Sequence, residues 1–121
     1  MTYDSNNIFA RILRGEIPCK KVHEDVHSLA FEDINPQAPV HTLVIPKGAY
    51  VSMTDFAAKA TEAEMASLNR TILKVVELKN LTQDGYRLLV NAGANGGQEV
   101  PHLHFHVVGG RPLGPMLMRK A

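Results

Sequence analysis

The most constraining feature of this 121-residue sequence is a stretch in which histidine alternates with apolar residues. The stretch reads His102-Leu-His-Phe-His-Val-Val, so that histidine stands at positions 102, 104 and 106. Successive side chains of a β-strand point to opposite faces, and same-face neighbours lie about 6.5–7 Å apart. We therefore predict a strand over residues 102–108 that presents three imidazoles on one face and buries Leu103, Phe105 and Val107 on the other.

Short apolar runs separated by turn signals predict four further strands. They cover residues 21–24, 28–31, 41–45 and 86–91, and the last of them, with Leu88-Leu89-Val90, has the composition of a central strand. A short N-terminal helix is predicted over residues 8–13, capped by Ser5 or Asn6 and ended by Gly15.

The longest predicted element is a helix that begins at a capping box formed by Thr61 and Glu64. Its apolar residues recur on one face until about residue 79. Together the elements predict an α+β fold, an antiparallel sheet of about five strands with one long helix and one short N-terminal helix. The position of the long helix between strands 41–45 and 86–91 also fits a parallel crossover, and spacing alone leaves both arrangements open.

The charge balance argues against several classes of partner. Thirteen basic and twelve acidic side chains give a net charge of +1 without any block of like charge, so we expect neither a nucleic-acid nor a membrane partner. The N-terminus lacks a signal-peptide profile, and the single cysteine, Cys19, has no internal disulfide partner. We expect one cytoplasmic domain over residues 1–121, with 111–121 as its tail.

A row of imidazoles can act in two ways. It can supply metal ligands, with His41 or Glu99 as a third ligand, or it can perform nucleophilic and acid–base chemistry. No cysteine, histidine or carboxylate cluster at ligand spacing accompanies the row, so neither a metal nor another cofactor is expected.

The segment that precedes the histidines is rich in glycine. Residues 91–99 read Asn-Ala-Gly-Ala-Asn-Gly-Gly-Gln-Glu. Glycine permits close backbone approach, and successive N–H groups in such a loop can bind an anion. Because this loop leads into the histidine stretch, the two features together suggest a phosphoryl or nucleotidyl group as the reacting centre.

Five segments of the chain resemble the histidine-triad superfamily and its Hint branch, the histidine-triad nucleotide-binding proteins. The resemblance covers about residues 5–112, and the segments occur in the order typical of the family. They are Ile8-Phe-Ala-Arg-Ile with Gly15-Glu-Ile-Pro, Ala30-Phe-Glu-Asp-Ile-Asn-Pro-Gln-Ala-Pro, His41-Thr-Leu-Val-Ile-Pro-Lys, Gly85-Tyr-Arg-Leu-Leu-Val-Asn running into Gly-Gly-Gln, and the histidine stretch itself.

This resemblance implies a homodimer of small α+β subunits. It further implies hydrolysis of purine nucleoside 5′-phosphoramidates, such as adenosine 5′-monophosphoramidate, to the nucleoside monophosphate and an amine through a nucleotidyl-histidine intermediate. By motif position, His104 corresponds to the nucleophile, His106 to a hydrogen-bond donor for the phosphate oxygens, and His102 to a residue that supports the site. His41 matches a histidine that helps to orient the nucleophile.

The resemblance also implies a set of substrate-binding residues. Asp33 corresponds to a ligand of the ribose hydroxyls, although a carboxylate in a turn is usually solvated. The residues that match the purine pocket are Ile8, Phe9, Ile17, Phe31 and Ile34, which fit an ordinary core equally well. Those that match the ribose-phosphate end are Asn91, Gly97, Gln98 and Glu99.

The sequence departs from the family pattern at Glu99, where many eukaryotic relatives carry serine. A carboxylate donates a proton only when protonated, and otherwise repels a phosphate. The residues leave two other functions open, a nucleotide-binding scaffold and a dinucleoside polyphosphate hydrolase. Near-normal turnover in a variant without His104 would contradict the nucleophile assignment.

Overall fold

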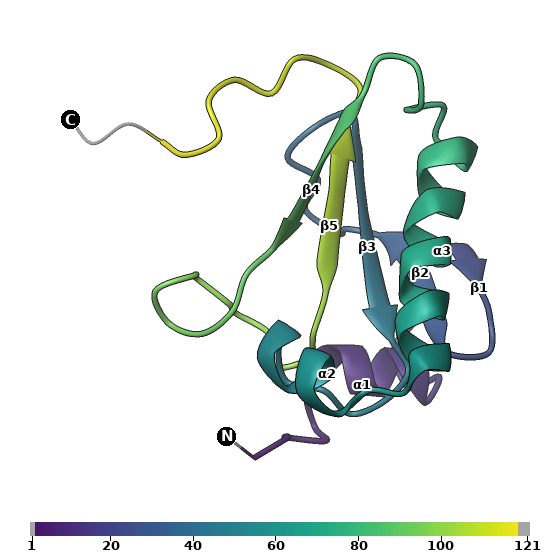
Figure 1. The fold of residues 1–121 in the computed structure, drawn as a ribbon, viewed down its shortest axis with the longest axis vertical. Coiled ribbons are helices and arrows are strands. Elements are labelled where there is room, and N and C mark those ends of the chain that lie inside the picture. Colours follow the sequence, from purple (N-terminus) through teal and green to yellow (C-terminus); the bar gives the residue numbers. More distant parts are fainter. Residues whose placement is uncertain (1, 119–121) are drawn as a thin grey trace.

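The computed structural model describes residues 2–118, in which five strands form one antiparallel sheet with three helices around it (Figure 1). In the sheet the strands follow the order β1-β2-β3-β5-β4, and every neighbouring pair is antiparallel. The strands are β1 (Lys21–Glu24), β2 (Ser28–Glu32), β3 (Val40–Pro46), β4 (Tyr86–Val90) and β5 (Phe105–Gly109). The helices are α1 (Ile8–Leu13), α2 (Met53–Lys59) and α3 (Glu62–Leu78). The predicted α+β fold is confirmed.

The long helix α3 covers one face of the sheet and builds the main core with it. Its predicted capping box is present, with Thr61 and Glu64 each bonding to the other's backbone N–H. The C-cap is Lys79, followed by Asn80 with a φ of 57°. This main core consists of Ala30, Val44, Phe56, Leu68, Ile72, Val75, Val76, Leu81, Leu103, Phe105 and Val107.

The opposite face of the sheet carries a second, smaller apolar cluster under α1. Alternation along β2 and β3 puts Leu29, Phe31, Leu43 and Ile45 on this face, where they pack against Phe9. In Figure 1, α1 and α2 lie across the end of the sheet at which β5 begins. The histidine segment therefore enters β5 between these two short helices and the sheet.

Helix α3 connects β3 to β4, and the structure resolves the alternative that spacing left open. Both strands are antiparallel to β5, which lies between them, so β3 and β4 run in the same direction without pairing. The connection is thus a crossover, but it joins no parallel pair.

Three sequence-based expectations are wrong in detail. The N-cap of α1 is Asn7, whose side chain accepts from the N–H of Ala10, rather than Ser5 or Asn6. Strand β4 lies at the edge of the sheet and not at its centre, and its three apolar residues Leu88, Leu89 and Val90 are 37–42% exposed. Helix α2 was not predicted, although Ser52 and Asp55 form a capping box at its start.

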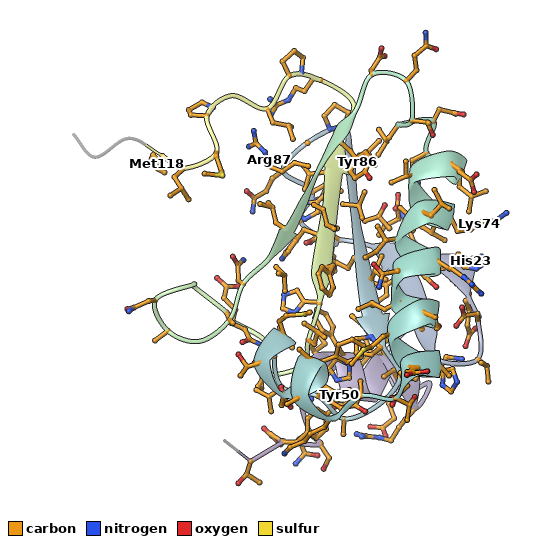
Figure 2. The ribbon with its side chains drawn as sticks, viewed as in Figure 1. His23, Tyr50, Lys74, Tyr86, Arg87 and Met118 are labelled. Atoms are coloured by element: carbon orange, nitrogen blue, oxygen red, sulfur yellow. The ribbon has the colours of Figure 1, made fainter. Side chains whose placement is uncertain are left out.

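Beyond β5 the chain leaves the sheet as an irregular tail (Figure 1). Arg87 of β4 donates to the carbonyl oxygens of Gly114 and Pro115 and so ties the tail to the edge strand (Figure 2). The end of the predicted tail, residues 119–121, and residue 1 lie outside the described residues. No helix within residues 2–118 combines the length and the apolar character that crossing a membrane requires.

Candidate active site

The histidine segment is extended, but only its second half belongs to the sheet. Strand β5 begins at Phe105 and not at His102, so the predicted strand over 102–108 is too long at its start. The N–H groups of His102 and Leu103 donate to Val100 and Tyr50 instead of to β3, and Pro101 has no N–H. Ladder pairing therefore starts three residues later than the alternation suggests.

The alternation of side chains nevertheless persists through the unpaired part. Leu103, Phe105 and Val107 all lie in the main core beneath α3. On the opposite side, the rings of His104 and His106 have centroids 5.0 Å apart, and the ring of Phe9 lies 4.9 Å from that of His104. The structure thus brings the histidines together on the α1 side, as the pattern predicts.

His104 has a defined tautomer because one of its ring nitrogens faces a carbonyl oxygen. Nδ1 lies 2.8 Å from the carbonyl oxygen of His102, which can only accept, so Nδ1 carries the proton. In the neutral ring this leaves a lone pair on Nε2. Burial lowers the pKa of His104, which keeps the ring neutral near neutral pH. His104 therefore presents an unprotonated ring nitrogen, Nε2.

His106 is fixed by a second histidine on the neighbouring strand. Nδ1 of His41 accepts the N–H of Gln37 at 3.1 Å, so the proton of the neutral His41 ring is on Nε2. That Nε2–H lies 2.9 Å from Nδ1 of His106, which accordingly accepts. In the neutral His106 ring, Nε2 then carries the proton. His41 thus contacts His106, and its implied role in orienting the nucleophile stays a prediction.

Nε2 of His106 is the one buried side-chain nitrogen or oxygen in residues 2–118 without a hydrogen-bond partner. Leaving such a donor unsatisfied costs about 1–3 kcal/mol. Burial, with the neighbouring rings of His104 and His41, lowers the pKa of His106 to about 4. The ring is therefore neutral at physiological pH and offers one unused N–H, and its centroid lies 5.0 Å from that of His104.

His102 is fully buried, and both of its ring nitrogens have hydrogen-bond partners. Its Nε2 lies 2.8 Å from the carbonyl oxygen of Pro46, and its Nδ1 lies 2.6 Å from the phenol oxygen of Tyr3. Burial lowers the pKa of His102. The sequence pattern does not indicate the part played by Tyr3, which is 99 positions away along the chain.

One group within residues 2–118 has the side chains for a metal site, namely Asp33, His41 and His106, whose ligand atoms all lie within 4.8 Å of one another. Two of the distances are 3.3 Å, from Asp33 Oδ2 to His41 Nε2, and 2.9 Å, from His41 Nε2 to His106 Nδ1. A metal needs a lone pair on His41 Nε2, but the N–H of Gln37 directs the proton of the ring to that atom. The geometry favours a hydrogen-bond chain over metal ligation.

The predicted ribose and purine residues divide into two groups. Asp33 lies beside His41, and Phe9 and Phe31 pack edge to face with centroids 5.6 Å apart near the histidines. Ile34 and Ile8, by contrast, are 92% and 45% exposed. Exposed isoleucines next to buried phenylalanines are consistent with an open apolar wall, but their contact with a purine stays a prediction, as does that of the half-buried Ile17.

Several polar groups of the glycine-rich loop already form hydrogen bonds within the protein. The N–H groups of Gly97 and Gln98 donate to the carbonyl oxygens of Ala94 and Gly93 at 3.1 Å. The side-chain amide of Gln98 donates to Val51 and Val100. These bonds hold the loop together, so the backbone N–H groups of Gly97 and Gln98 are not free to bind a phosphate. Glu99 is exposed and Asn91 half-buried, and their predicted roles stay predictions.

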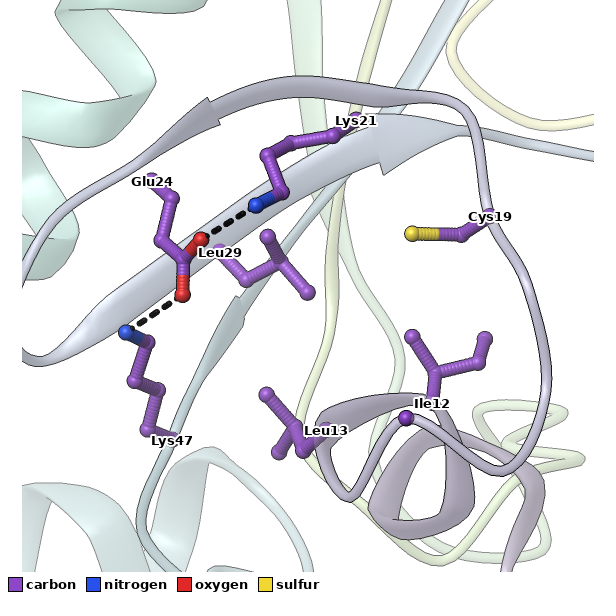
Figure 3. Close-up of a pocket in the computed structure, with 8 residues that line it drawn as sticks. Ile12, Leu13, Cys19, Lys21, Glu24, Leu29 and Lys47 are labelled. Atoms are coloured by element: carbon purple, nitrogen blue, oxygen red, sulfur yellow. Dashed lines mark hydrogen bonds and ion pairs between the residues drawn. The ribbon is translucent and has the colours of Figure 1, made fainter.

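A hollow of about 370 Å³ is lined by apolar side chains of α1 and β2 together with Cys19. Glu24 bridges Lys21 and Lys47 at its rim, with N–O distances of 2.5 and 2.7 Å (Figure 3). These lysines lower the pKa of Glu24 to about 2. The hollow contains none of the predicted site residues.

Comparisons with known proteins place the histidine site in a family context. The model of the HIT domain family matches residues 14–113. An uncharacterised 13.2 kDa HIT-like protein of Azospirillum brasilense is 64% identical over 118 residues, which cover 98% of this chain and 97% of that protein. The purine nucleoside phosphoramidase of Escherichia coli K12 is 44% identical over 113 residues, covering 93% and 94%. A HIT family hydrolase of Legionella pneumophila superposes with a TM-score of 0.80 at 39% identity, covering 90% and 96%.

Proposed function

Because this chain belongs to the HIT domain family, we propose that it is a hydrolase of purine nucleoside 5′-phosphoramidates, such as adenosine 5′-monophosphoramidate. The observation that carries the proposal is the pair of ring nitrogens at the centre of the site. The lone pair on His104 Nε2 lies beside the unused N–H of His106, two rings 5.0 Å apart. A nucleophile next to a neutral donor suits attack on phosphorus, where negative charge on oxygen must be stabilised.

The reaction then has two displacement steps. His104 Nε2 attacks phosphorus, the phosphorus–nitrogen bond to the amine breaks, and the amine leaves with a proton taken from water. Nδ1–H of His104 stays bonded to the carbonyl oxygen of His102, which stabilises the positive charge of the nucleotidyl-imidazole. Water next attacks phosphorus and gives its proton to the hydroxide left by the first step, while the phosphorus–Nε2 bond breaks and its electron pair returns to the imidazole. The nucleoside monophosphate is the second product.

His106 has a distinct task in both steps. Its Nε2–H donates to a phosphate oxygen once the substrate displaces the protein atoms that cover it. His41 keeps the ring in the required tautomer, because its own Nε2–H occupies His106 Nδ1 at 2.9 Å. The binding free energy gained at a previously unsatisfied donor exceeds that at a solvated one, since no bond to water is lost.

The remaining groups would bind the nucleoside. Asp33 accepts from the ribose hydroxyls, while the wall of Ile8, Phe9, Ile17, Phe31 and Ile34 takes the purine. Asn91 and Glu99 meet the ribose-phosphate end, and Gly97 and Gln98 shape the loop there through their own hydrogen bonds. The proximity of Asp33 to His41, at 3.3 Å, and of Phe9 to His104 supports this arrangement. The free Cys19 is consistent with a cytoplasmic enzyme.

We also propose that two copies of the chain pair through β4. The strand is the edge of the sheet, and its apolar side chains Leu88, Leu89 and Val90 are 37–42% exposed. An antiparallel edge is self-complementary about a two-fold axis, so a second copy extends the sheet and covers these side chains. Sedimentation should show about twice 13.3 kDa for the native chain and a monomer for Leu89→Lys. A native monomer would contradict this pairing.

The test of the hydrolase is turnover of an adenosine phosphoramidate with a fluorogenic amine by the native chain and by His104→Ala. We expect turnover by the first and almost none by the second. A diadenosine polyphosphate serves as the competing substrate. A higher kcat/KM on the polyphosphate would assign the site to phosphate leaving groups, and nucleoside monophosphate binding without turnover of either substrate would make it a binding module.

A further inference from the structure

Tyr3 is the one phenol that contacts the histidine site within residues 2–118. Its oxygen lies 2.6 Å from Nδ1 of His102, and the two rings meet edge to face with centroids 5.6 Å apart. On its other side, His102 Nε2 lies 2.8 Å from the carbonyl oxygen of Pro46, which can only accept. The proton of the neutral ring is therefore on Nε2, and the phenol O–H donates to Nδ1.

The segment that carries Tyr3 is fixed to the start of α1. The main-chain N–H and the side-chain amide of Asn7 both donate to the carbonyl oxygen of Asp4, at 3.1 and 2.7 Å. The same side chain caps α1 by accepting from Ala10, and Arg14 donates to the carbonyl oxygen of Ser5 at 2.7 Å. These bonds to the carbonyl oxygens of Asp4 and Ser5 hold the turn from which Tyr3 reaches His102.

The phenol of Tyr3 can influence the tautomer of His104 through the main chain of His102. Nδ1 of this fully buried ring has no partner other than Tyr3 in the described part of the chain. The carbonyl oxygen of the same residue accepts Nδ1–H of His104 at 2.8 Å and so determines which nitrogen of His104 is free. A shift of His102 would change this acceptor and with it the tautomer of the nucleophile.

We propose that Tyr3 is a positioning residue of the hydrolytic site, whose phenol holds His102 between Pro46 and α1 so that Nε2 of His104 stays unprotonated. The inference rests on the proposed function for its kinetic part only. Removal of the phenol oxygen leaves the buried Nδ1 of His102 without a donor, and this free-energy cost favours rotation of the ring or its movement toward water. The predicted consequence is a smaller fraction of His104 in the reactive tautomer.

The experiment compares Tyr3→Phe with Tyr50→Phe in the full chain. Tyr50 is the matched control, because its phenol also donates one part-buried hydrogen bond, at 2.8 Å to Glu64, but has no contact with a histidine ring. Turnover of the fluorogenic phosphoramidate gives kcat and KM. Nitrogen chemical shifts of ¹⁵N-histidine-labelled protein without substrate report which ring nitrogen of His104 is protonated.

For Tyr3→Phe we expect kcat to fall about tenfold with KM within twofold, a change of about 1.4 kcal/mol. The Nε2 shift of His104 should move toward that of a protonated nitrogen, and Tyr50→Phe should show neither effect. Native kcat together with native His104 shifts in Tyr3→Phe would overturn the proposal, and so would equal losses in both variants. If the native chain cleaves no phosphoramidate, the proposed function fails, while the nitrogen shifts still test the role of Tyr3.

Discussion

The two faces of the segment 102–107 show how one short stretch serves both stability and chemistry. Toward α3, Leu103 and Val107 are completely buried among apolar side chains. Toward α1, each imidazole is oriented by a hydrogen bond to a specific acceptor or donor. The contribution of the first face depends on the volume of its apolar side chains, and that of the second on the direction of its hydrogen bonds. Substitutions on the α3 face should therefore change the free energy of unfolding, and those on the α1 face the rate.

The largest effect is expected on the α1 face, from His104→Ala. Without a nucleophile, kcat on the phosphoramidate should fall more than about 10³-fold, while the free energy of unfolding falls by about 1–3 kcal/mol, because the buried carbonyl oxygen of His102 loses its donor. Steady-state kinetics and urea unfolding measure the two quantities. His23→Ala, which removes a half-buried histidine of β1 from outside the site (Figure 2), is the control and should keep its activity.

The matching change on the α3 face is Leu103→Ala, one residue away. Because Leu103 is fully buried, the variant should lose about 2–5 kcal/mol of unfolding free energy. The kcat per folded molecule, measured at low temperature, should stay within a few-fold of native. Leu73→Ala on the exposed side of α3, where the leucine is 55% exposed, should lose less than about 0.5 kcal/mol. A large loss of kcat with unchanged stability in Leu103→Ala would abolish the distinction between the faces.

His41→Ala tests whether hydrogen-bond orientation also matters at a histidine that contacts His106 rather than the nucleophile itself. The variant removes the donor to Nδ1 of His106, so the His106 ring can protonate either nitrogen and its Nε2–H is no longer assured. We expect kcat/KM to fall about 10–100-fold, in the range of a lost positioning contact. His41→Gln, whose amide N–H can replace the imidazole donor, should recover part of the loss. Equal activity of the two variants would count against the hydrogen-bond chain.

The sequence predicts which residues lie on each face better than it predicts where the strands and helices begin and end. Alternation along 102–107 correctly separates imidazoles from apolar residues even where the strand has not yet begun, because an extended backbone alternates with or without ladder bonds. The edge position of β4 was missed, since Leu88-Leu89-Val90 has the same composition whether a strand is central or exposed at an edge. The capping box of Thr61 and Glu64 indicates the start of α3, and Ser52 and Asp55 carry the same signal at the start of α2.

The orientation of the imidazoles could not be predicted from the sequence. It depends on specific partners, namely the carbonyl oxygen of Pro46 and the phenol of Tyr3, which are distant along the chain from His102, and the N–H of Gln37, four residues before His41. Two of these are main-chain groups, which every residue carries, so no residue type marks them. The histidines could thus be identified from their pattern, whereas their tautomers follow only from the folded chain.

A further effect expected on the α1 face is a pH dependence of stability. Burial and the rings of His104 and His41 lower the pKa of His106 from about 6.5 to about 4, against the attraction of Asp33. The unfolded chain therefore binds more protons than the folded one between these pH values. By linkage, the free energy of unfolding falls as the pH falls from about 6.5 to about 4, and this contribution is constant below about 4.

His106→Gln isolates this contribution, because burial lowers the pKa of His102 and His104 in the same direction and their share remains in the variant. Urea unfolding at several pH values should give a shallower acid slope for His106→Gln than for the native chain. The control, Leu103→Ala, should shift the whole curve downward without changing its slope, because it removes volume and no titrating group. Parallel curves for the native chain and His106→Gln would mean that the surroundings of His106 do not hold its ring neutral. The difference between the two faces would then not appear in the pH dependence of the unfolding free energy.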